Sequence, residues 1–259
     1  MSDLTLGNIL DGFAPITLDE MDRVKLMNRI DTKFAFHSDR LAFYLNEIIE
    51  HYKLLTINGT TTPHYESLYF DDHQFRFFRD HHNAKGDRFK VRIRKYVESN
   101  LFFLEIKHNY KGRTDKKRIL TESFHSAFDS NQKEFIRKQM NEDIELQPKM
   151  WNSFQRITLV NNTLNERLTL DFNIEFHFEG NEKKFPNLII AELKQEELNR
   201  NSPFFVIMKN AHVRPYRLSK YCLGSVELYG EEKLKFNRFK KKLLFLNKIE
   251  KNEQHAFIS

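Results

Sequence analysis

Two neighbouring segments of the sequence alternate between charged and apolar residues in a way that could bind an anion. Residues 88–94 read RFKVRIR and residues 101–107 read LFFLEIK, with a short polar turn between them. In a β-strand, successive side chains point to opposite faces, so Lys90, Arg92 and Arg94 share one face. The forked guanidinium group of arginine is suited to the oxygens of a phosphate group. The pattern therefore predicts a β-hairpin with one cationic face.

A single hairpin of this kind is more typical of a half-exposed sheet whose charged face lies in solvent. At least seven strand-like segments repeat the pattern, however, and they carry charges of both signs. Residues 166–178, for example, place Arg167, Asp171 and Glu175 on one face and large apolar residues on the other. Amphipathic helices between the strands need an apolar surface to cover. These observations predict an α+β fold, in which a closed or nearly closed antiparallel β-barrel has a charged interior and is surrounded by helices.

Periodicity and turn residues predict the order of the elements. Thr17 and Glu20 indicate a capping box at the start of one helix, and Pro203 takes the first position of another. Helices are expected at residues 4–13, 17–24, 39–52, 71–80, 126–140, 202–211 and 235–252. Strands are expected at residues 28–36, 54–58, 65–70, 89–94, 101–107, 116–120, 151–161, 166–178 and 188–194.

The composition is that of a folded protein with an anionic partner. Of the 259 residues, 40% are apolar and 25 are Phe, and the formal net charge is +6. Nucleic acid is disfavoured, because the basic residues recur at every second position on separate strands without aromatic stacking residues on the same face. The single cysteine, Cys222, excludes an internal disulfide and a multi-cysteine zinc site. Because no apolar run approaches ~18 residues and no signal peptide begins the chain, we expect a cytoplasmic protein that is not itself transmembrane.

The charges predicted to face one cavity are unequal in sign. Up to eleven cations stand against about five carboxylates, and buried charges are costly without compensation. A polyanionic ligand would supply the missing negative charge, and Mn²⁺ or Mg²⁺ would suit carboxylate and phosphate oxygens together. The cations are Lys33, Lys90, Arg92, Arg94, Lys107, Lys116, Arg118, Arg156, Arg167, Lys194 and Lys220. The carboxylates are Asp31, Glu105, Asp171, Glu175 and Glu192.

Eight short motifs, each weak alone, occur in an order that resembles the VTC domain. This is the polyphosphate polymerase domain within the triphosphate tunnel metalloenzyme, or CYTH-like, superfamily. The motifs are R-x-D-x-K at 29–33, Y-x-S-x-Y-F-D at 65–71, K-x-R-x-R-K-Y at 90–96, E-x-K at 105–107, K-x-R at 116–118, R-x-T-x-D at 167–171, E-L-K at 192–194 and S-K-Y at 219–221. The resemblance covers roughly residues 25–225. It implies a closed eight-stranded antiparallel tunnel and a single domain over residues 1–259, with N-terminal helices at 1–24 and a basic C-terminal helix at 235–252.

The resemblance also implies an activity and the residues that carry it. The tunnel would transfer the γ-phosphoryl group of ATP to a growing inorganic polyphosphate chain and release ADP. Arg92, Arg94, Arg156 and Lys220 would be catalytic, and Glu192 would hold Mn²⁺ or Mg²⁺. The residues implied to bind substrate phosphates are Lys33, Lys90, Lys107, Lys116, Arg118, Arg167 and Lys194.

Two positions depart from the pattern of some family members. Phe154 stands where a tyrosine occurs, which removes a hydroxyl donor, and Asn109 stands where a histidine occurs. Neither residue is expected to take part in making or breaking bonds, so the expected effect on catalysis is modest. The orientation of the nucleotide could differ.

Three further questions stay open at this point. An inorganic or nucleoside triphosphatase would use a similar tunnel to activate water, although such enzymes tend to begin with E-x-E-x-K, where this chain has only Asp31 before Lys33. A non-catalytic sensor would bind polyphosphate without turnover. Lysines 240–242 would suit an acidic lipid surface or a membrane-protein partner, which would make the protein membrane-associated, but a solvated helix face is the commoner interpretation. The sequence does not indicate an oligomeric state.

Overall fold

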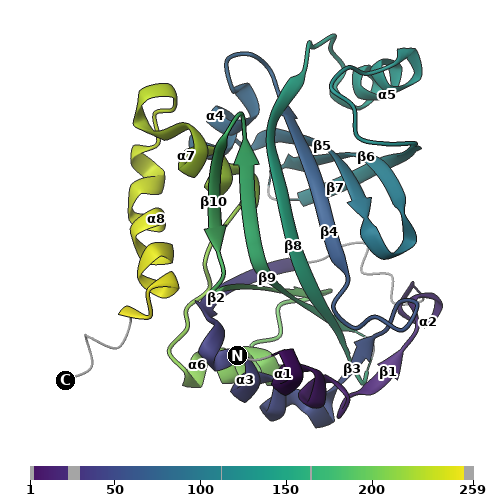
Figure 1. The fold of residues 1–259 in the computed structure, drawn as a ribbon, viewed down its shortest axis with the longest axis vertical. Coiled ribbons are helices and arrows are strands. Elements are labelled where there is room, and N and C mark those ends of the chain that lie inside the picture. Colours follow the sequence, from purple (N-terminus) through teal and green to yellow (C-terminus); the bar gives the residue numbers. More distant parts are fainter. Residues whose placement is uncertain (1–2, 23–29, 112, 164, 254–259) are drawn as a thin grey trace.

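A curled antiparallel β-sheet forms the centre of the molecule (Figure 1). The computed structural model describes residues 3–22, 30–111, 113–163 and 165–253. Eight strands follow one another across the sheet in the order β2 (Ile30–His37), β11 (Leu188–Gln195), β9 (Glu166–Phe178), β8 (Gln147–Asn161), β4 (His64–Asp71), β5 (Asp87–Tyr96), β6 (Leu101–Tyr110) and β7 (Arg113–Thr121). Three short strands lie off this path: β10 (Asn181–Phe185) pairs with β9, β3 (Tyr52–Leu55) pairs with β8, and β1 (Ala14–Ile16) runs parallel to β3.

The sheet is open, so the prediction of a closed eight-stranded barrel is wrong. Within the described ranges, β2 and β7 end the path and do not pair with each other. The sheet nevertheless curls far enough to bring side chains near its two ends together. Asp31 Oδ2 of β2 lies 3.9 Å from Lys107 Nζ of β6, the strand next to the other end. Alternation tells which face a residue occupies, but closure depends on hydrogen bonds between the two edge strands, and the pattern carries no information about these.

The helices gather in two groups rather than surrounding the sheet evenly (Figure 1). One group consists of α1 (Asp3–Leu10), α3 (Leu41–Ile48) and α6 (Pro203–Asn210). The other consists of α4 (Arg76–His82), α7 (Lys220–Lys233) and α8 (Asn237–Glu250), while α2 (Leu18–Asp22) and α5 (Ser130–Met140) lie apart. Each group encloses its own apolar core: Leu45 and Phe204 are buried in the first, and Phe78 and Val226 in the second.

A β-bulge divides β9 into two halves with different surroundings. Asn173 has a left-handed backbone conformation (φ 49°), and the register between β8 and β9 shifts between Ser153 and Gln155. Before the bulge, Phe172 belongs to the first apolar core, whereas after it Phe176 belongs to the second. A bulge inserts one residue into the alternation and therefore exchanges the two faces beyond it.

This bulge overturns one prediction about the charged face. Glu175 was expected to share a face with Arg167 and Asp171, but it lies beyond the bulge. It is partly exposed there and pairs with Lys184 of β10, with Nζ and Oε1 3.7 Å apart. Glu175 therefore does not join the predicted charged cavity.

Helix α7 is the largest element that the sequence pattern did not predict. Ser219 caps it by accepting a hydrogen bond from the backbone N–H of Cys222. The helix packs so closely on the sheet that a Cβ atom on Gly224 would lie 2.2 Å from Met150 Sδ and 2.4 Å from a ring carbon of Phe176. Glycine at this position lets the helix approach β8 and β9, which brings the start of α7, with Lys220, to the charged face.

Most other predicted elements occur, with shifted boundaries. The strand at residues 166–178 is confirmed, and the C-terminal helix begins at residue 237 rather than 235. The capping box is also confirmed, because Thr17 Oγ1 accepts from the Glu20 N–H (3.3 Å) and Glu20 Oε2 accepts from the Thr17 N–H (2.9 Å). Strands β1 and β10 were not predicted, and residues 23–29, where one predicted helix ends and one predicted strand begins, lie outside the described residues. Across the described part of the chain, there is no helix with the length and apolarity needed to cross a membrane.

Candidate functional site

Strands β5, β6 and β7 present a charged face that the alternation predicted. The strand register aligns two rows of side chains across these strands, and the alternate residues, such as Ile93 and Leu104, are completely buried on the other face. The two rows are Lys90, Lys107, Lys116 and Arg92, Glu105, Arg118. Together with Arg94, these six residues form what we call the hairpin wall.

Glu105 is the anionic centre of the hairpin wall. Its Oε2 accepts hydrogen bonds from Arg92 Nε (2.8 Å) and Nη2 (2.6 Å), and its Oε1 lies 2.5 Å from Lys116 Nζ. The hydroxyl oxygen of Tyr69 in turn accepts a hydrogen bond from Arg92 Nη1 at 2.9 Å. Burial alone would raise the pKa of Glu105, but Arg92 and Lys116 hold this pKa below its ordinary value. Glu105 is thus ionised and fixes the direction of both cations.

A second charged group lies on β8, β9 and the start of α7. Asp171 Oδ1 and Oδ2 accept from Arg156 Nε (2.5 Å) and Nη2 (2.9 Å), and Oδ2 also pairs with Lys220 Nζ. Burial is again outweighed, because Arg156 and Lys220 lower the pKa of Asp171. Only 2% of the surface of Asp171 is exposed, so this triad is part of the folded core of the site.

A third group joins β2 to β11. Glu192 Oε2 lies 2.6 Å from Lys194 Nζ, and Glu192 Oε1 pairs with Lys33. Lys194 Nζ also donates a hydrogen bond to Thr169 Oγ1 at 3.2 Å. Burial lowers the pKa of Lys33 and Lys194 despite the carboxylate they share, and neighbouring cations add to the effect. We call the second and third groups together the paired wall; its residues are Lys33, Arg156, Asp171, Glu192, Lys194 and Lys220.

The two walls face each other across the concave side of the curled sheet. Asp31 and Lys107 meet across the opening at 3.9 Å. Like-charge repulsion also spans it, because Lys107 and Lys194 each lower the pKa of Lys33, after the larger effect of burial. Only side chains inside the curl can interact over this path, so the charged face is the concave one.

The lysine row of the hairpin wall holds more positive charge than its partners neutralise. Burial, together with Arg92 and Arg88, lowers the pKa of Lys90 to about 8, and in the described chain Lys90 contacts no carboxylate. Burial and Lys90 lower the pKa of Lys107 to about 8, and burial lowers that of Lys116 to about 7. An anion placed here would raise all three pKa values and would be bound by all three ammonium groups.

Arg94 is held by groups that the sequence interpretation did not assign to the site. Its Nε donates to Ser67 Oγ at 3.0 Å, and its guanidinium carbon lies 5.4 Å from the ring centres of both Tyr65 and Phe154. With Tyr69 on Arg92, the three alternate residues Tyr65, Ser67 and Tyr69 of the motif at 65–71 thus each contact an arginine. The alternation of Tyr65, Ser67 and Tyr69 within the motif at 65–71 was the available signal.

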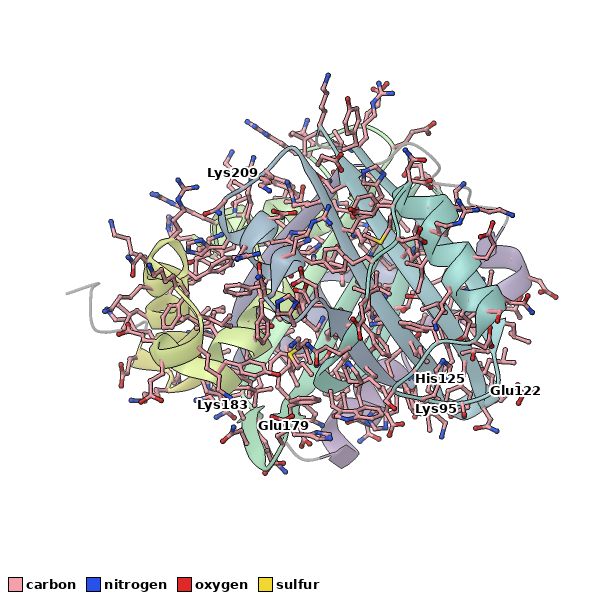
Figure 2. All side chains as sticks on the ribbon, turned by 90° about the horizontal axis from the view of Figure 1, so that it is seen from above. Lys95, Glu122, His125, Glu179, Lys183 and Lys209 are labelled. Carbon is pink, nitrogen blue, oxygen red and sulfur yellow. The ribbon has the colours of Figure 1, made fainter. Side chains whose placement is uncertain are left out.

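Two of the predicted cations lie at the margin of the arrangement. Arg118 places its guanidinium carbon 4.4 Å from the ring centre of Phe103, and Arg167 Nη1 lies 3.8 Å from Met21 Sδ. Lys183, by contrast, lies at the periphery of the molecule, near Glu179 in Figure 2. Its Nζ is 3.6 Å from Glu227 Oε2, a longer ion pair than those that Glu105 forms on the concave face.

The side chains alone do not form a metal cage. Within the described residues, no three His, Cys, Asp or Glu side chains come together as a metal-binding group. Glu192 is one of the carboxylates on the concave face; its side chain is about 16% exposed and contacts two lysines. Mg²⁺ and Mn²⁺ are commonly held by one or two carboxylates together with substrate phosphates and water, so Glu192 fits such an ion only as a shared ligand.

Comparison with known proteins gives one family. The family model of the VTC domain matches residues 28–229, which includes all the residues of both walls. A comparison with curated proteins finds no match.

Solved structures give more distant likenesses. A Bacillus halodurans protein, described as a candidate adenylate cyclase, is 12% identical with a TM-score of 0.45, over 74% of this chain and 96% of that chain. The Hippeastrum protein HpAC1, described as having a dominant triphosphatase activity, is 14% identical with a TM-score of 0.41, over 75% and 94%. The Pct1 RNA triphosphatase of S. pombe is 10% identical with a TM-score of 0.28, over 82% and 84%.

Proposed function

This chain belongs to the VTC domain family, and we propose that it transfers the γ-phosphoryl group of ATP to the end of an inorganic polyphosphate chain and releases ADP. The observation that carries the proposal is the lysine row of the hairpin wall. Three ammonium groups whose pKa values lie near 7–8 stand side by side on the concave face, opposite a second set of cations. A ligand with several negative charges in a line matches this row, and a phosphate chain is such a ligand.

The reaction would join an oxygen of the terminal phosphate of the chain to the γ-phosphorus of ATP. The bond between that phosphorus and the bridging oxygen of ADP would break, and this oxygen would leave with the bond's electron pair. The attacking oxygen is already an anion, so no side chain needs to remove a proton from it. The protein therefore has to align the two anions and neutralise their charge.

Four cations are proposed to neutralise the transferring group: Arg92, Arg94, Arg156 and Lys220. Three of them are held in place by a buried carboxylate, Glu105 or Asp171, and Arg94 by Ser67 and two aromatic rings. Cations oriented before substrate binds lose little free energy to reorganisation during the reaction. The remaining phosphate contacts are proposed for Lys33, Lys90, Lys107, Lys116, Arg118, Arg167 and Lys194.

Glu192 is proposed to hold Mn²⁺ or Mg²⁺ jointly with phosphate oxygens of the substrate. Such an ion would neutralise charge on the phosphates next to the reacting group. Lys33 and Lys194 now share this carboxylate, and both would be free to turn to phosphate oxygens when the ion takes their place.

Hydrolysis by water is the main competing reaction. A triphosphatase needs a group that can accept a proton from water, and the buried carboxylates are poor candidates. Arg92 holds the pKa of Glu105 low, and Arg156 does the same for Asp171, in each case against the effect of burial. These side chains would remain ionised and bound to cations, which favours transfer to an anionic acceptor over activation of water.

An assay of products from ATP and Mn²⁺, with and without a short polyphosphate primer, tests the proposal. We expect one phosphoryl unit to be added to polyphosphate for each ADP released. We expect Arg92→Ala to lower the rate by a factor on the order of 10²–10³, the range for removing one preorganised group. Glu192→Ala is expected to lose the metal-dependent rate, and Lys117→Ala, on the outer face of β7, to retain activity. ADP with orthophosphate alone would identify a triphosphatase, and binding without turnover would identify a sensor.

A further inference from the structure

The concave face ends in an aromatic ledge that phosphate binding does not use. The strand register places Phe103 directly opposite Arg94 on one side and Leu120 on the other, so these side chains share the charged face. Leu120 exposes 64% of its surface and Leu101 exposes 44%. The ledge consists of Tyr96, Leu101, Phe103 and Leu120. Polyphosphate has no apolar part, so the exposed apolar side chains beside this cluster of cations would make no hydrophobic contact with it.

The packing of the ledge leaves the outer face of the Arg118 guanidinium group accessible to solvent. Tyr96 and Phe103 pack edge to face, with centroids 5.7 Å apart and planes at 86°, and Tyr96 donates a hydrogen bond to Glu105 Oε1 at 3.3 Å. The guanidinium of Arg118 covers Phe103 at 4.4 Å. Arg118 is exposed and, among the residues that the structure describes, forms no ion pair. Its outer surface is therefore available to a planar ligand.

We propose that the ledge binds the base of the nucleoside triphosphate, which stacks on the Arg118–Phe103 layer. This inference rests on the proposed function, because it requires the phosphates to lie on the charged face. Nucleobases stack on aromatic rings and on guanidinium planes, and this stacking does not depend strongly on which base is present. Arg118 would thereby contact the base in addition to its proposed phosphate contact.

The spacing along the strands fits this orientation. Residues two apart on a strand are separated by about 6.6–6.8 Å, so Leu120 lies one step beyond Arg118 and two steps beyond Lys116. A base on the Arg118–Phe103 layer would place the ribose near Arg118 and let the phosphates extend across the wall toward Arg92 and Arg94, which are proposed to neutralise the transferring group.

Calorimetric titration of the metal-free protein with ATP and with tripolyphosphate tests the ledge, because only ATP carries a base. Phe103→Ala should weaken ATP binding by about 5- to 150-fold, the range for loss of one stacking platform, and change tripolyphosphate binding less than about twofold. Phe103→Tyr should retain both affinities. Tyr110→Ala, which removes an exposed aromatic residue at the far end of β6, should also change neither. Leu120→Asn changes an exposed position, where we expect folding to be unaffected. It should weaken ATP binding, but less than Phe103→Ala does, and leave tripolyphosphate binding unchanged.

The outcomes separate the ledge from the proposed function. The ledge proposal would be overturned if both Phe103→Ala and Leu120→Asn changed the affinities for ATP and tripolyphosphate equally, or changed neither affinity. The proposed phosphate site would be unaffected by that result. Failure of the unmodified protein to bind either ligand would overturn the proposed function and the ledge together.

Discussion

The two walls of the concave face contain the same residue types but balance their charges differently. In the paired wall, Asp171 and Glu192 each contact two cations, and Asp171 is almost completely buried. In the hairpin wall, Glu105 is the single carboxylate among six cations, and the side chains of Lys107 and Lys116 are 40% and 34% exposed. The paired wall thus has two cations for each carboxylate, each in direct contact with it, whereas the hairpin wall has six cations for one carboxylate.

This difference separates two tasks that a phosphate site must perform. Buried ion pairs hold their members in fixed directions, and removing one member leaves a costly unpaired charge. Cations in excess attract an anion but repel one another, and the depressed pKa values of the lysine row report that repulsion together with burial. We infer that the paired wall provides geometry and the hairpin wall provides affinity.

Breaking the paired wall should have the largest effect on stability. Asp171→Asn leaves Arg156 and Lys220 buried without their carboxylate, and we expect the free energy of unfolding at pH 7 to fall by about 3–5 kcal/mol. Chemical denaturation measures this change. The matched control is Glu175→Gln on the same strand beyond the bulge, where the side chain is partly exposed and the expected change is below about 0.5 kcal/mol. Equal losses in the two variants would show that the paired wall has no special role.

Removing a cation from the hairpin wall should reduce affinity rather than stability. We expect Lys107→Ala to weaken tripolyphosphate binding about tenfold, because a charge-assisted hydrogen bond contributes about 1.5–3 kcal/mol and Lys107 is partly exposed. Lys117→Ala on the neighbouring strand removes the same charge from the opposite face and should change affinity less than twofold. Titration calorimetry distinguishes the two, and equal effects would mean that only net charge matters.

The pH dependence of binding should identify the lysine row. Lys116 has a pKa of about 7, and Lys90 and Lys107 have pKa values of about 8, so the free row loses protons as the pH rises through this range. A bound anion raises these pKa values, so binding takes up protons and affinity falls with rising pH. Trimetaphosphate is a suitable probe because its own charge stays fixed. Lys107→Arg should flatten the profile, since arginine stays protonated; affinity that rises with pH would contradict the assignment.

The smallest expected effect is a gain in stability. Lys90 is partly buried near other cations without a carboxylate partner in the described chain, so Lys90→Met should raise the free energy of unfolding by about 1 kcal/mol while weakening tripolyphosphate binding. Thermal or chemical denaturation measures the first change and calorimetry the second. A loss of stability would mean that Lys90 supports the fold.

The sequence was most informative about the hairpin wall. The alternation of charged and apolar residues at 89–94 and 104–107 assigned Lys90, Arg92, Glu105 and Lys107 to one face, and the strand register confirms this. Local periodicity is sufficient there because both strands are regular and joined by a short turn. The roles of these residues remain predictions.

The paired wall depends on features that alternation does not contain. The bulge at Asn173 removes Glu175 from the charged face, and helix α7 brings Lys220 to Asp171 from a distant part of the chain. Both features depend on tertiary contacts. The bulge contains a left-handed residue inside a strand, and the position of α7 is set by its close packing at Gly224. The open edge between β2 and β7 has the same origin, because pairing of edge strands is not encoded within either strand.

The most direct test of the two-wall account is a crystal structure with tripolyphosphate and Mn²⁺, in which anomalous scattering locates the metal. We expect the phosphates between the two walls, in contact with Lys107 and Arg156, and Mn²⁺ bound to Glu192 and phosphate oxygens. Phosphates or Mn²⁺ bound elsewhere on the protein, with the concave face unchanged, would contradict the account.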